Sequence, residues 1–244
     1  IARKYTQICV FCVYYIHKSK AMGACRRGKK DQFTINISNK KILQGLLTEL
    51  KIAEDKQYEV LKSIDKLDRL GFEGVEQLLK EGRTDGSGAF VKGCQLSNEQ
   101  VSQIKTIINV KDLNELKSNL KNELSIQGIK ETEELYEVLS FGKNLSQVAT
   151  NLCITRGLSY YSSFTVETNL NFKIKNVKGK EISAGSCASG GRYNSLISRF
   201  RGADYKGSGM SIGIDRLLYA LNQINELKVK SKQPVLVCVL DQKY

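Results

Sequence analysis

The chain has 244 residues, of which 41% are hydrophobic and 26% are charged, the balance of an ordinary soluble globular protein with room for one large domain. No apolar run approaches the roughly 18 residues that a membrane-spanning helix needs, so no membrane partner is expected. His17 is the single histidine, which argues against imidazole metal sites and against catalysis by a Ser–His or Cys–His pair.

The net charge of +13 is unevenly placed along the sequence. Basic side chains outnumber acidic ones in residues 1–60 and 145–244, whereas residues 61–144 are slightly acidic. Excess positive charge favours polyanionic partners such as nucleic acid, although a lysine-rich solvated surface has the same composition. The acidic middle segment is therefore not expected to be the main phosphate-binding surface.

Seven cysteines are scattered along the chain, and Cys9 and Cys12 form a Cys-x-x-Cys pair. On a strand these two side chains would face opposite ways, and no second pair lies at the spacing of a zinc site. The cysteines are therefore predicted to be free thiols in a reducing compartment.

The first fifth of the chain predicts strands followed by a helix. Residues 1–16 are rich in β-branched and aromatic side chains and predict a strand. Residues 18–30 form a basic stretch, which is either a solvated loop or a loop that contacts phosphates. Residues 33–38 alternate as a second strand, and Asn39 then opens a helix with one apolar stripe: Ile42, Leu46, Leu47 and Leu50.

Residues 52–142 predict a run of helices with short breaks. Apolar stripes at helical spacing recur through this segment, Gly71 ends the first helix, and Ser97 can cap a later one. Gly82–Gly93 is predicted to be a loop because of its glycines. Leucine stripes of this kind usually form a core, so the segment is predicted to be a helical domain.

After residue 147 the pattern changes to strands. Val148–Ile154 alternates as a half-buried strand that ends near Arg156, and a longer strand is predicted from Phe164. Lys178–Lys180 is predicted to be a hairpin turn, from which the chain returns as a strand at Glu181. Strands joined by hairpins indicate an antiparallel sheet with helices on one side.

Shorter elements are predicted toward the end of the chain. In order, they are a Gly190–Gly191 turn, a helix over 193–200, a break at Gly207–Gly209, a short strand over 210–212, a helix over Ile214–Leu227 and a strand over Val235–Leu240 after Pro234.

Three blocks in the second half of the chain combine cations, tyrosines and glycines. Arg-Gly-Leu-Ser-Tyr-Tyr at 156–161 places a cation and a flexible glycine at a strand end, and two adjacent tyrosines on an extended chain would point to opposite faces. The second block is Ala-Ser-Gly-Gly-Arg-Tyr-Asn at 188–194, and the third is Gly-Met-Ser-Ile-Gly-Ile-Asp-Arg-Leu at 209–217. An arginine that opens a helix after an apolar strand is suited to hold a phosphate.

In this order, the three blocks resemble the histidyl-tRNA synthetases. The first resembles the family's Arg-Gly-Leu-Asp-Tyr-Tyr signature, with Ser159 where aspartate is usual. The second resembles its Ala-Gly-Gly-Arg-Tyr-Asp block, with Ser189 and Asn194 as departures, and the third resembles motif 3 of class II aminoacyl-tRNA synthetases, ending in Arg216. Ser-Ile-Asp-Lys-Leu-Asp at 63–68 is close to a eukaryotic family sequence, so a eukaryotic type is expected.

The resemblance implies an α+β fold. It implies an incomplete class II aminoacyl-tRNA synthetase core, an antiparallel sheet flanked by helices, with a helical insertion domain. The expected parts are a partial catalytic core at 1–50, the helical insertion domain at 51–144, the catalytic core with the histidine motifs and motif 3 at 145–230, and the start of an anticodon-binding domain at 231–244.

The implied function is that of a histidine–tRNA ligase, which activates histidine with ATP and transfers it to tRNA(His). Mg²⁺ is expected with the ATP, but no residue is assigned to a metal. A homodimer is expected for the full-length family, in the cytoplasm, with a mitochondrial location left open. Arg156 is expected at the α-phosphate and the histidine carboxylate, and Arg216 at the γ-phosphate of a bent ATP. The other residues that the resemblance assigns to the histidine pocket are Tyr160, Tyr161, Gly190, Gly191 and Tyr193.

Some family motifs have no counterpart in these 244 residues: motif 1, the Thr-x-Glu histidine loop and the motif 2 loop. The chain is therefore expected to be a truncated copy, and whether it is active alone is left open. The alternative is a non-catalytic tRNA-binding or sensor module of the same family, which the lost carboxylates at Ser159 and Asn194 favour. A third possibility is a misassembled product with unpaired sheet edges.

Overall fold

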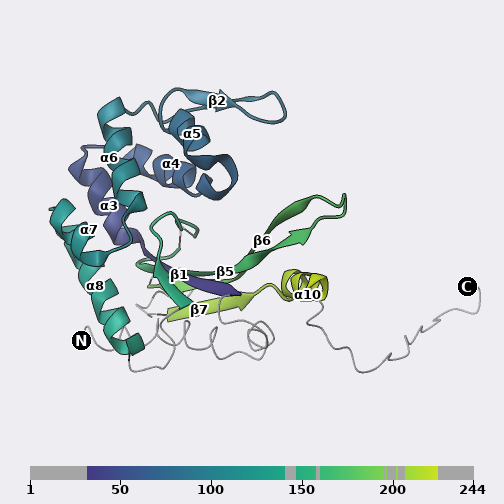
Figure 1. Ribbon diagram of the computed structural model, residues 1–244. Helices are drawn as coiled ribbons and strands as arrows, with labels where there is room; N and C mark the ends of the chain where they lie inside the picture. Colours follow the sequence, from purple (N-terminus) through teal and green to yellow (C-terminus); the bar gives the residue numbers. More distant parts are fainter. Residues whose placement is uncertain are drawn as a thin grey trace, which may run out of the picture.

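The computed structural model describes residues 32–140, 147–157, 160–194, 196, 202 and 207–224. They form a helical part, residues 40–140, and a β-sheet that lies below it in the view of Figure 1. Several predictions lie outside the described residues: the elements before residue 31, most of the helix over 193–200, the strand after Pro234, and Ser159. No described helix is both long and apolar enough to cross a membrane.

The sheet has five strands in the order β4-β1-β5-β6-β7. Their bounds are β1 Phe33–Asn39, β4 Val148–Thr150, β5 Phe164–Lys175, β6 Glu181–Tyr193 and β7 Gly207–Ile212. Four strands pair antiparallel as predicted, but β4 runs parallel to β1. The expectation of a purely antiparallel sheet is wrong at this edge, because the whole helical part connects β1 to β4 and no hairpin is needed there.

The β5–β6 hairpin has the turn that its sequence predicts. The Asn176 side chain accepts hydrogen bonds from the backbone N–H groups of Lys178 and Lys180, and Gly179 has a φ of +75°. An amide side chain that mimics a turn and a glycine at positive φ are both local features. The turn could therefore be recognised without any knowledge of the tertiary structure.

Two glycine-rich predictions are wrong. Gly190–Gly191 lies inside β6 and pairs with both neighbouring strands, and Gly207–Gly209 is paired strand in β7. Glycine inside a strand allows another group to approach the backbone closely. A tyrosine ring packs against Gly191, Gly207 and Gly209, and the neighbouring strand β7 lies against Gly190. No helix begins at Tyr193, where one was predicted, because this residue still belongs to β6.

The strand predicted over Val148–Ile154 ends at Thr150. Beyond it the chain leaves the sheet, and Leu152 is fully buried in the core of the helical part. The apolar residues that continue the alternation beyond Thr150 are therefore buried, but against helices and not through continued strand pairing.

The helical part contains six helices among the described residues. They are α3 Lys40–Glu49, α4 Glu54–Ile64, α5 Leu67–Leu79, α6 Asn98–Asn109, α7 Leu113–Asn119 and α8 Glu123–Ser140. Ser97 caps α6, as predicted. Gly71 was predicted to end the first helix, but that helix, α4, ends earlier, at Ile64, and Gly71 instead interrupts α5 with a φ of +65°. The loop predicted at Gly82–Gly93 instead contains a small hairpin of β2 Gly82–Thr84 and β3 Phe90–Lys92.

Two hydrophobic clusters form the core. One joins α3 to α7 with the first half of α8. The other lies on one face of the sheet, under α10 Ile214–Gln223 and the second half of α8. Side chains on the opposite face of the sheet are polar, and one row runs across four strands in register: Asn36, Glu167, Ser189 and Ser211.

Glu131 of α8 joins the helical part to the sheet. Its carboxylate accepts hydrogen bonds from Lys41 Nζ at 2.6 Å, Ser163 Oγ at 2.7 Å and Asn39 Nδ2 at 3.1 Å. Burial alone would raise the pKa of Glu131, but the hydrogen bonds from Lys41, Ser163 and Asn39 outweigh it and lower the pKa. The ionised carboxylate therefore stabilises the start of α3 and the start of β5 together.

Replacing Glu131 by glutamine should destabilise the chain by about 1–3 kcal/mol, because an amide loses charge-assisted hydrogen bonds in a half-buried site. A carboxyl group with a lowered pKa stabilises the fold above its unfolded pKa, and loses this effect as the pH falls through the lowered value. The difference between Glu131→Gln and the parent should therefore shrink below about pH 4. Urea denaturation across pH measures it. Glu137→Gln, on the exposed side of the same helix, is the control, and an equal loss in both variants would contradict the assignment.

Candidate functional site

The segment before Arg156 is anchored to both parts of the molecule. The N–H of Asn151 donates to the carbonyl of Ile37 in β1 at 2.9 Å, and Thr155 Oγ1 donates to the carbonyl of Leu61 in α4 at 2.8 Å. Gly157 follows with a φ of +69°, a conformation that L-residues with a side chain rarely adopt. The Arg156 side chain is therefore presented from a turn held between the helices and the sheet.

Arg156 forms two ion pairs with carboxylates from opposite parts of the fold. Its Nη1 lies 3.3 Å from Glu167 Oε2 in β5, and its Nε lies 3.6 Å from Asp65 Oδ1 at the end of α4. The guanidinium side chain is still 50% exposed. It is therefore fixed in direction but remains open to a ligand.

Glu167 is the buried partner of this pair, with only 3% of its side chain exposed. Burial raises the pKa of the Glu167 carboxyl, and the charge of Arg156 and a hydrogen bond from Asn169 offset the rise only in part. A buried carboxylate costs free energy unless a cation stands beside it. The ionised form of Glu167 therefore depends on Arg156, and the orientation of the Arg156 side chain depends in turn on Glu167.

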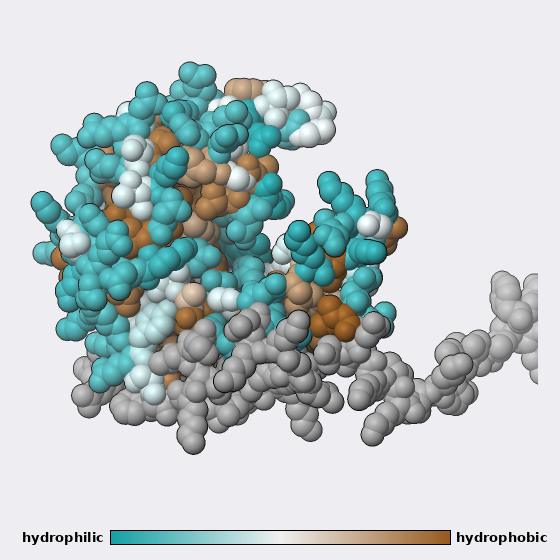
Figure 2. Space-filling view, in the orientation of Figure 1, coloured by the Kyte–Doolittle hydropathy of each residue, from teal (hydrophilic) through white to brown (hydrophobic). Residues whose placement is uncertain are grey.

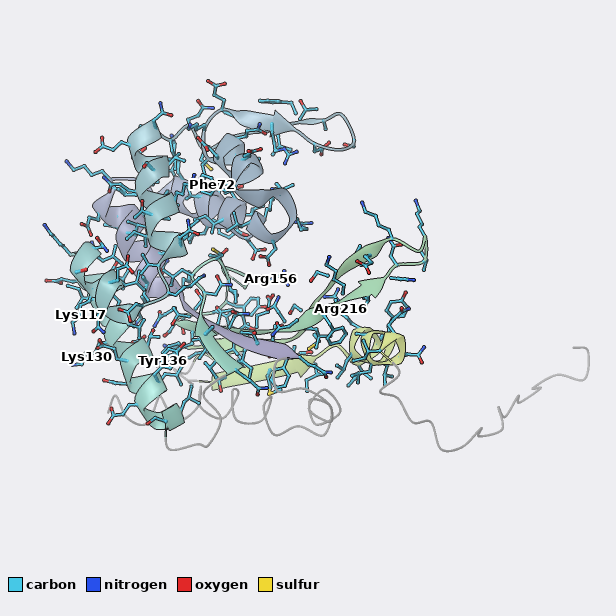
Figure 3. The ribbon with its side chains drawn as sticks, viewed as in Figure 1. Phe72, Lys117, Lys130, Tyr136, Arg156 and Arg216 are labelled. Atoms are coloured by element: carbon cyan, nitrogen blue, oxygen red, sulfur yellow. The ribbon has the colours of Figure 1, made fainter. Side chains whose placement is uncertain are left out.

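Arg156 and Arg216 line the same cavity, of about 400 Å³. Its walls are the middle of β6, the end of β7 and the first turn of α10. In Figure 3 both arginines lie on the side of the sheet that faces the helical part. Figure 2 shows an open recess between the helical part and the β5–β6 hairpin, with hydrophilic residues along much of its wall.

Arg216 comes from the first turn of α10, and its Nη1 donates to the carbonyl of Ser186 at 2.6 Å. The N–H of Gly213, just before α10, donates to the carbonyl of Cys187, so the helix start is pinned to β6. A helix N-terminus carries a partial positive charge and free N–H groups, which favour anions. Two guanidinium groups and this helix start together make the cavity suited to a phosphate-bearing ligand.

The two predicted pocket tyrosines do not point to opposite faces. The N–H groups of Tyr160 and Tyr161 both donate to the carbonyl of Gly157, so this segment is a turn and not an extended strand. The two rings touch, with centroids 4.4 Å apart. Tyr161 also packs against Gly157 and Gly191, where a Cβ atom would come within 2.3 and 2.6 Å of its ring. Tyr160 is 38% exposed and is the ring that a ligand could reach.

Gly190 and Gly191 do not leave empty space. A Cβ on Gly190 would lie 2.5 Å from the carbonyl oxygen of Gly209, so the neighbouring strand already fills that position. Tyr193 packs its ring over Gly207 and Gly209 in the same way. These three residues therefore hold the strands and rings together, and neighbouring atoms fill the space beside both glycines.

Asn194, where the family has aspartate, keeps a hydrogen bond. Its Oδ1 accepts from Arg192 Nε at 3.2 Å, and the Arg192 carbonyl in turn accepts from the N–H of Ser162, next to the tyrosine turn. An amide oxygen can make this contact as a carboxylate would, but without the negative charge. The departure at this position therefore removes a negative charge, while the amide oxygen of Asn194 accepts a hydrogen bond from Arg192.

Several residues of the site were missed by the sequence reasoning. Ser186, Ser189, Ser211 and Asp215 line the cavity, and Asp65 pairs with Arg156. The strand register could have indicated Ser189 and Ser211, since both are in line with Glu167. Asp65 lies in the Ser-Ile-Asp-Lys-Leu-Asp segment, whose family likeness was noticed but to which no role was given.

The mixed sheet and the helices packed against it are those of a class II aminoacyl-tRNA synthetase core. A family model described as histidyl-tRNA synthetase matches residues 21–217. The chain therefore belongs to the histidyl-tRNA synthetase family, and the expected fold class is confirmed.

Relatives and solved structures agree with this family. The chain is 58% identical over 218 residues to a histidine–tRNA ligase of Pelagibacter ubique, which covers 88% of the chain and 47% of the relative. It is 34% identical over 222 residues to that of Ruegeria pomeroyi, covering 87% and 45%. The crystal structure of histidyl-tRNA synthetase from Nostoc matches with a TM-score of 0.67 and 26% identity, over 86% of this chain and 48% of that one.

The chain thus spans about half the length of the curated relatives it matches. A structure from Bacillus halodurans, titled an ATP phosphoribosyltransferase regulatory subunit/histidyl-tRNA synthetase, has a TM-score of 0.64 at 19% identity and shows the fold alone. The relatives named above are bacterial, so the comparisons do not support the eukaryotic type that the Ser63–Asp68 segment suggested.

Replacing Gly191 by alanine should destabilise the chain by about 1–3 kcal/mol through overpacking. The added Cβ would lie 2.6 Å from both the Phe164 carbonyl oxygen and the Tyr161 ring, so backbone or ring must shift. Denaturant unfolding measures the change. Gly86→Ala is the control, because a Cβ there has no neighbour within 4 Å among the described residues. Equal stability of the two variants would show that the ring does not pack on Gly191.

Replacing Arg156 by methionine should destabilise the chain by about 1–2 kcal/mol at pH 7, since Glu167 would stay buried without its cation and solvent screens the half-exposed arginine. Because the pKa of Glu167 is already raised, the fold favours its protonated form, and the cost of ionising it appears as the pH rises through the raised pKa. Removing Arg156 raises that pKa further. The difference in the free energy of unfolding between variant and parent should therefore fall as the pH is lowered toward about 4. Urea titrations at several pH values measure it.

A Glu167→Gln background provides the control. There the Arg156→Met replacement should lower the free energy of unfolding much less, and an undiminished loss would contradict the ion pair.

Proposed function

We propose that the protein containing this chain is a histidine–tRNA ligase, which uses ATP to activate histidine and transfers it to tRNA(His). The observation that supports it most directly is the shared cavity of Arg156 and Arg216, in a chain that belongs to the histidyl-tRNA synthetase family. The curated relatives named above are histidine–tRNA ligases.

In the activation step, the histidine carboxylate attacks the α-phosphate of ATP, and pyrophosphate leaves. Negative charge builds on the phosphate oxygens in the transition state, so fixed cations supply most of the protein's contribution. We assign Arg156 to the α-phosphate and the histidine carboxylate, and Arg216 with the start of α10 to the γ-phosphate. Both guanidinium groups are held by neighbouring oxygens before any ligand arrives, which lowers the cost of ordering them.

The histidine pocket is assigned to the aromatic side of the site. Tyr160 offers an exposed ring and hydroxyl beside the turn that carries Arg156, and a phenol can both pack against an imidazole and hydrogen-bond it. Tyr161, Gly190, Gly191 and Tyr193 shape this side through the close contacts described above.

Mg²⁺ is proposed to arrive with ATP. The described residues contain no group of three His, Cys, Asp or Glu side chains that could hold a metal ion. Mg²⁺ in nucleotide sites is commonly held by one or two carboxylates together with substrate phosphates, and Asp215 is a carboxylate on the wall of the cavity. We also propose a homodimer, as expected for the family, and action in the cytoplasm.

A non-catalytic module of the same fold is the second candidate, and the loss of the carboxylate at Asn194 favours it. The hydrogen bond that Asn194 accepts from Arg192 weakens this argument, because a neutral amide oxygen is a sufficient acceptor there. The two candidates differ in one measurable activity: a ligase exchanges pyrophosphate into ATP when histidine is present, and a module that only binds tRNA does not.

We expect histidine-dependent ATP–pyrophosphate exchange from the full-length protein, and a loss of about 100-fold in kcat/KM for ATP in Arg216→Ala, because one fixed cation at the triphosphate is removed. Steady-state exchange kinetics at varied ATP measure it. Lys178→Ala removes an exposed cation from the hairpin turn, away from the cavity-lining residues, and should leave exchange unchanged. Binding of tRNA without any exchange would instead support the non-catalytic module.

A further inference from the structure

We propose that Asp65, in the corner between α4 and α5, is a positioning residue for Arg156 in the activation step, an inference that rests on the proposed function. The carboxylate holds the guanidinium from the helical side of the molecule, 3.6 Å from its Nε, while Glu167 holds it from the sheet. The helical part would then contribute directly to the chemistry of the cavity.

The corner and the Arg156 turn are fixed to one another through a shared acceptor. The carbonyl of Leu61, in the last turn of α4, accepts hydrogen bonds from the N–H of Asp65 and from Thr155 Oγ1. Thr155 is buried and directly precedes Arg156. Since both partners of the ion pair are tied to the same carbonyl group, their separation is set by the end of α4.

Asp65 stands between two helix ends. It is the residue that ends α4, whose C-terminus carries a partial negative charge, and α5 begins two residues later at Leu67 with a partial positive charge. The effects of the two helix ends on a carboxylate therefore oppose each other at this position. The charged partner of the Asp65 carboxylate in the structure is Arg156.

More carboxylates surround Arg156 than are needed to neutralise one guanidinium group. Asp65, Asp68 and Glu167 line a small cavity with Arg156 on the side facing the helices, and the larger cavity with Arg216 lies on its other side. The two ion pairs use Nε and Nη1, and leave Nη2 without an ion-pair partner among the described residues. Two carboxylates at two different nitrogens fix both the position and the rotation of a planar group.

The closing experiment measures histidine-dependent ATP–pyrophosphate exchange by the full-length protein. Asp65→Asn should lower kcat about tenfold, because a misplaced catalytic group loses rate mainly in the transition state, and should change the KM for ATP by less than about twofold. Asp68→Asn is the matched control: it removes a carboxylate from the same small cavity, but Asp68 forms no ion pair with Arg156. Asp65→Glu, which restores the charge, should recover most of kcat. An unchanged kcat in Asp65→Asn, or an equal loss in Asp68→Asn, overturns the proposal.

A double replacement separates positioning from a general structural effect. In an Arg156→Met background, Asp65→Asn should lower the remaining exchange less than twofold, since its effect acts through the missing arginine. A further tenfold loss in that background would overturn the proposal.

If the parent protein shows no exchange, the proposed function is wrong, and the same variants then test the Asp65–Arg156 ion pair through stability. Melting temperatures of the parent, Asp65→Asn, Arg156→Met and the double variant then form a cycle. The double variant should melt clearly above the temperature expected from adding the two single shifts. Strict additivity would overturn the ion pair and with it the positioning role, whatever the activity.

Discussion

A buried carboxylate in the middle of a sheet needs a cation, and Glu167 obtains one from Arg156. Because Glu167 attracts the Arg156 guanidinium, this group is held in one orientation although it stands at the edge of an open cavity. The charge pair is placed by β5 on one side and by the turn after β4 on the other. Since Asp65 adds a second carboxylate from the end of α4, the helices and the sheet both determine where the cation lies.

The glycines and tyrosines of the site form a second constraint, set by packing instead of charge. Tyr161 lies against Gly157 and Gly191, and Tyr193 covers Gly207 and Gly209. Any larger side chain at these glycines would meet a ring or a backbone atom. The glycines therefore allow the rings to approach the strands closely, and the Tyr161 ring holds the tyrosine turn against β6.

The sequence could predict what local chemistry decides. The cap at Asn39 and the turn at Asn176 each depend on a few neighbouring residues, and both were correct. The strand positions of Gly190 and Gly207 could not be predicted from their neighbours in sequence, because glycine pairs are more typical of turns. The groups that crowd these glycines come from elsewhere in the chain: the β7 backbone at Gly190 and the Tyr193 ring at Gly207. The Arg156 and Arg216 pair was predicted through family resemblance, and the structure brings both to one cavity. Asp65 was missed, since contact with Arg156 depends on tertiary packing and has no local signal.

The lost carboxylate at Asn194 differs from the carboxylates that surround Arg156. Asn194 sits beside Arg192, where the amide oxygen accepts a hydrogen bond without carrying a charge. Glu167 and Asp65 act through their charge, because each forms an ion pair with the Arg156 guanidinium. An amide can replace a carboxylate that serves as an acceptor, but not one that neutralises a cation. The replacement at residue 194 is therefore compatible with a working arginine pair, whereas the same replacement at Asp65 or Glu167 would change where Arg156 is held.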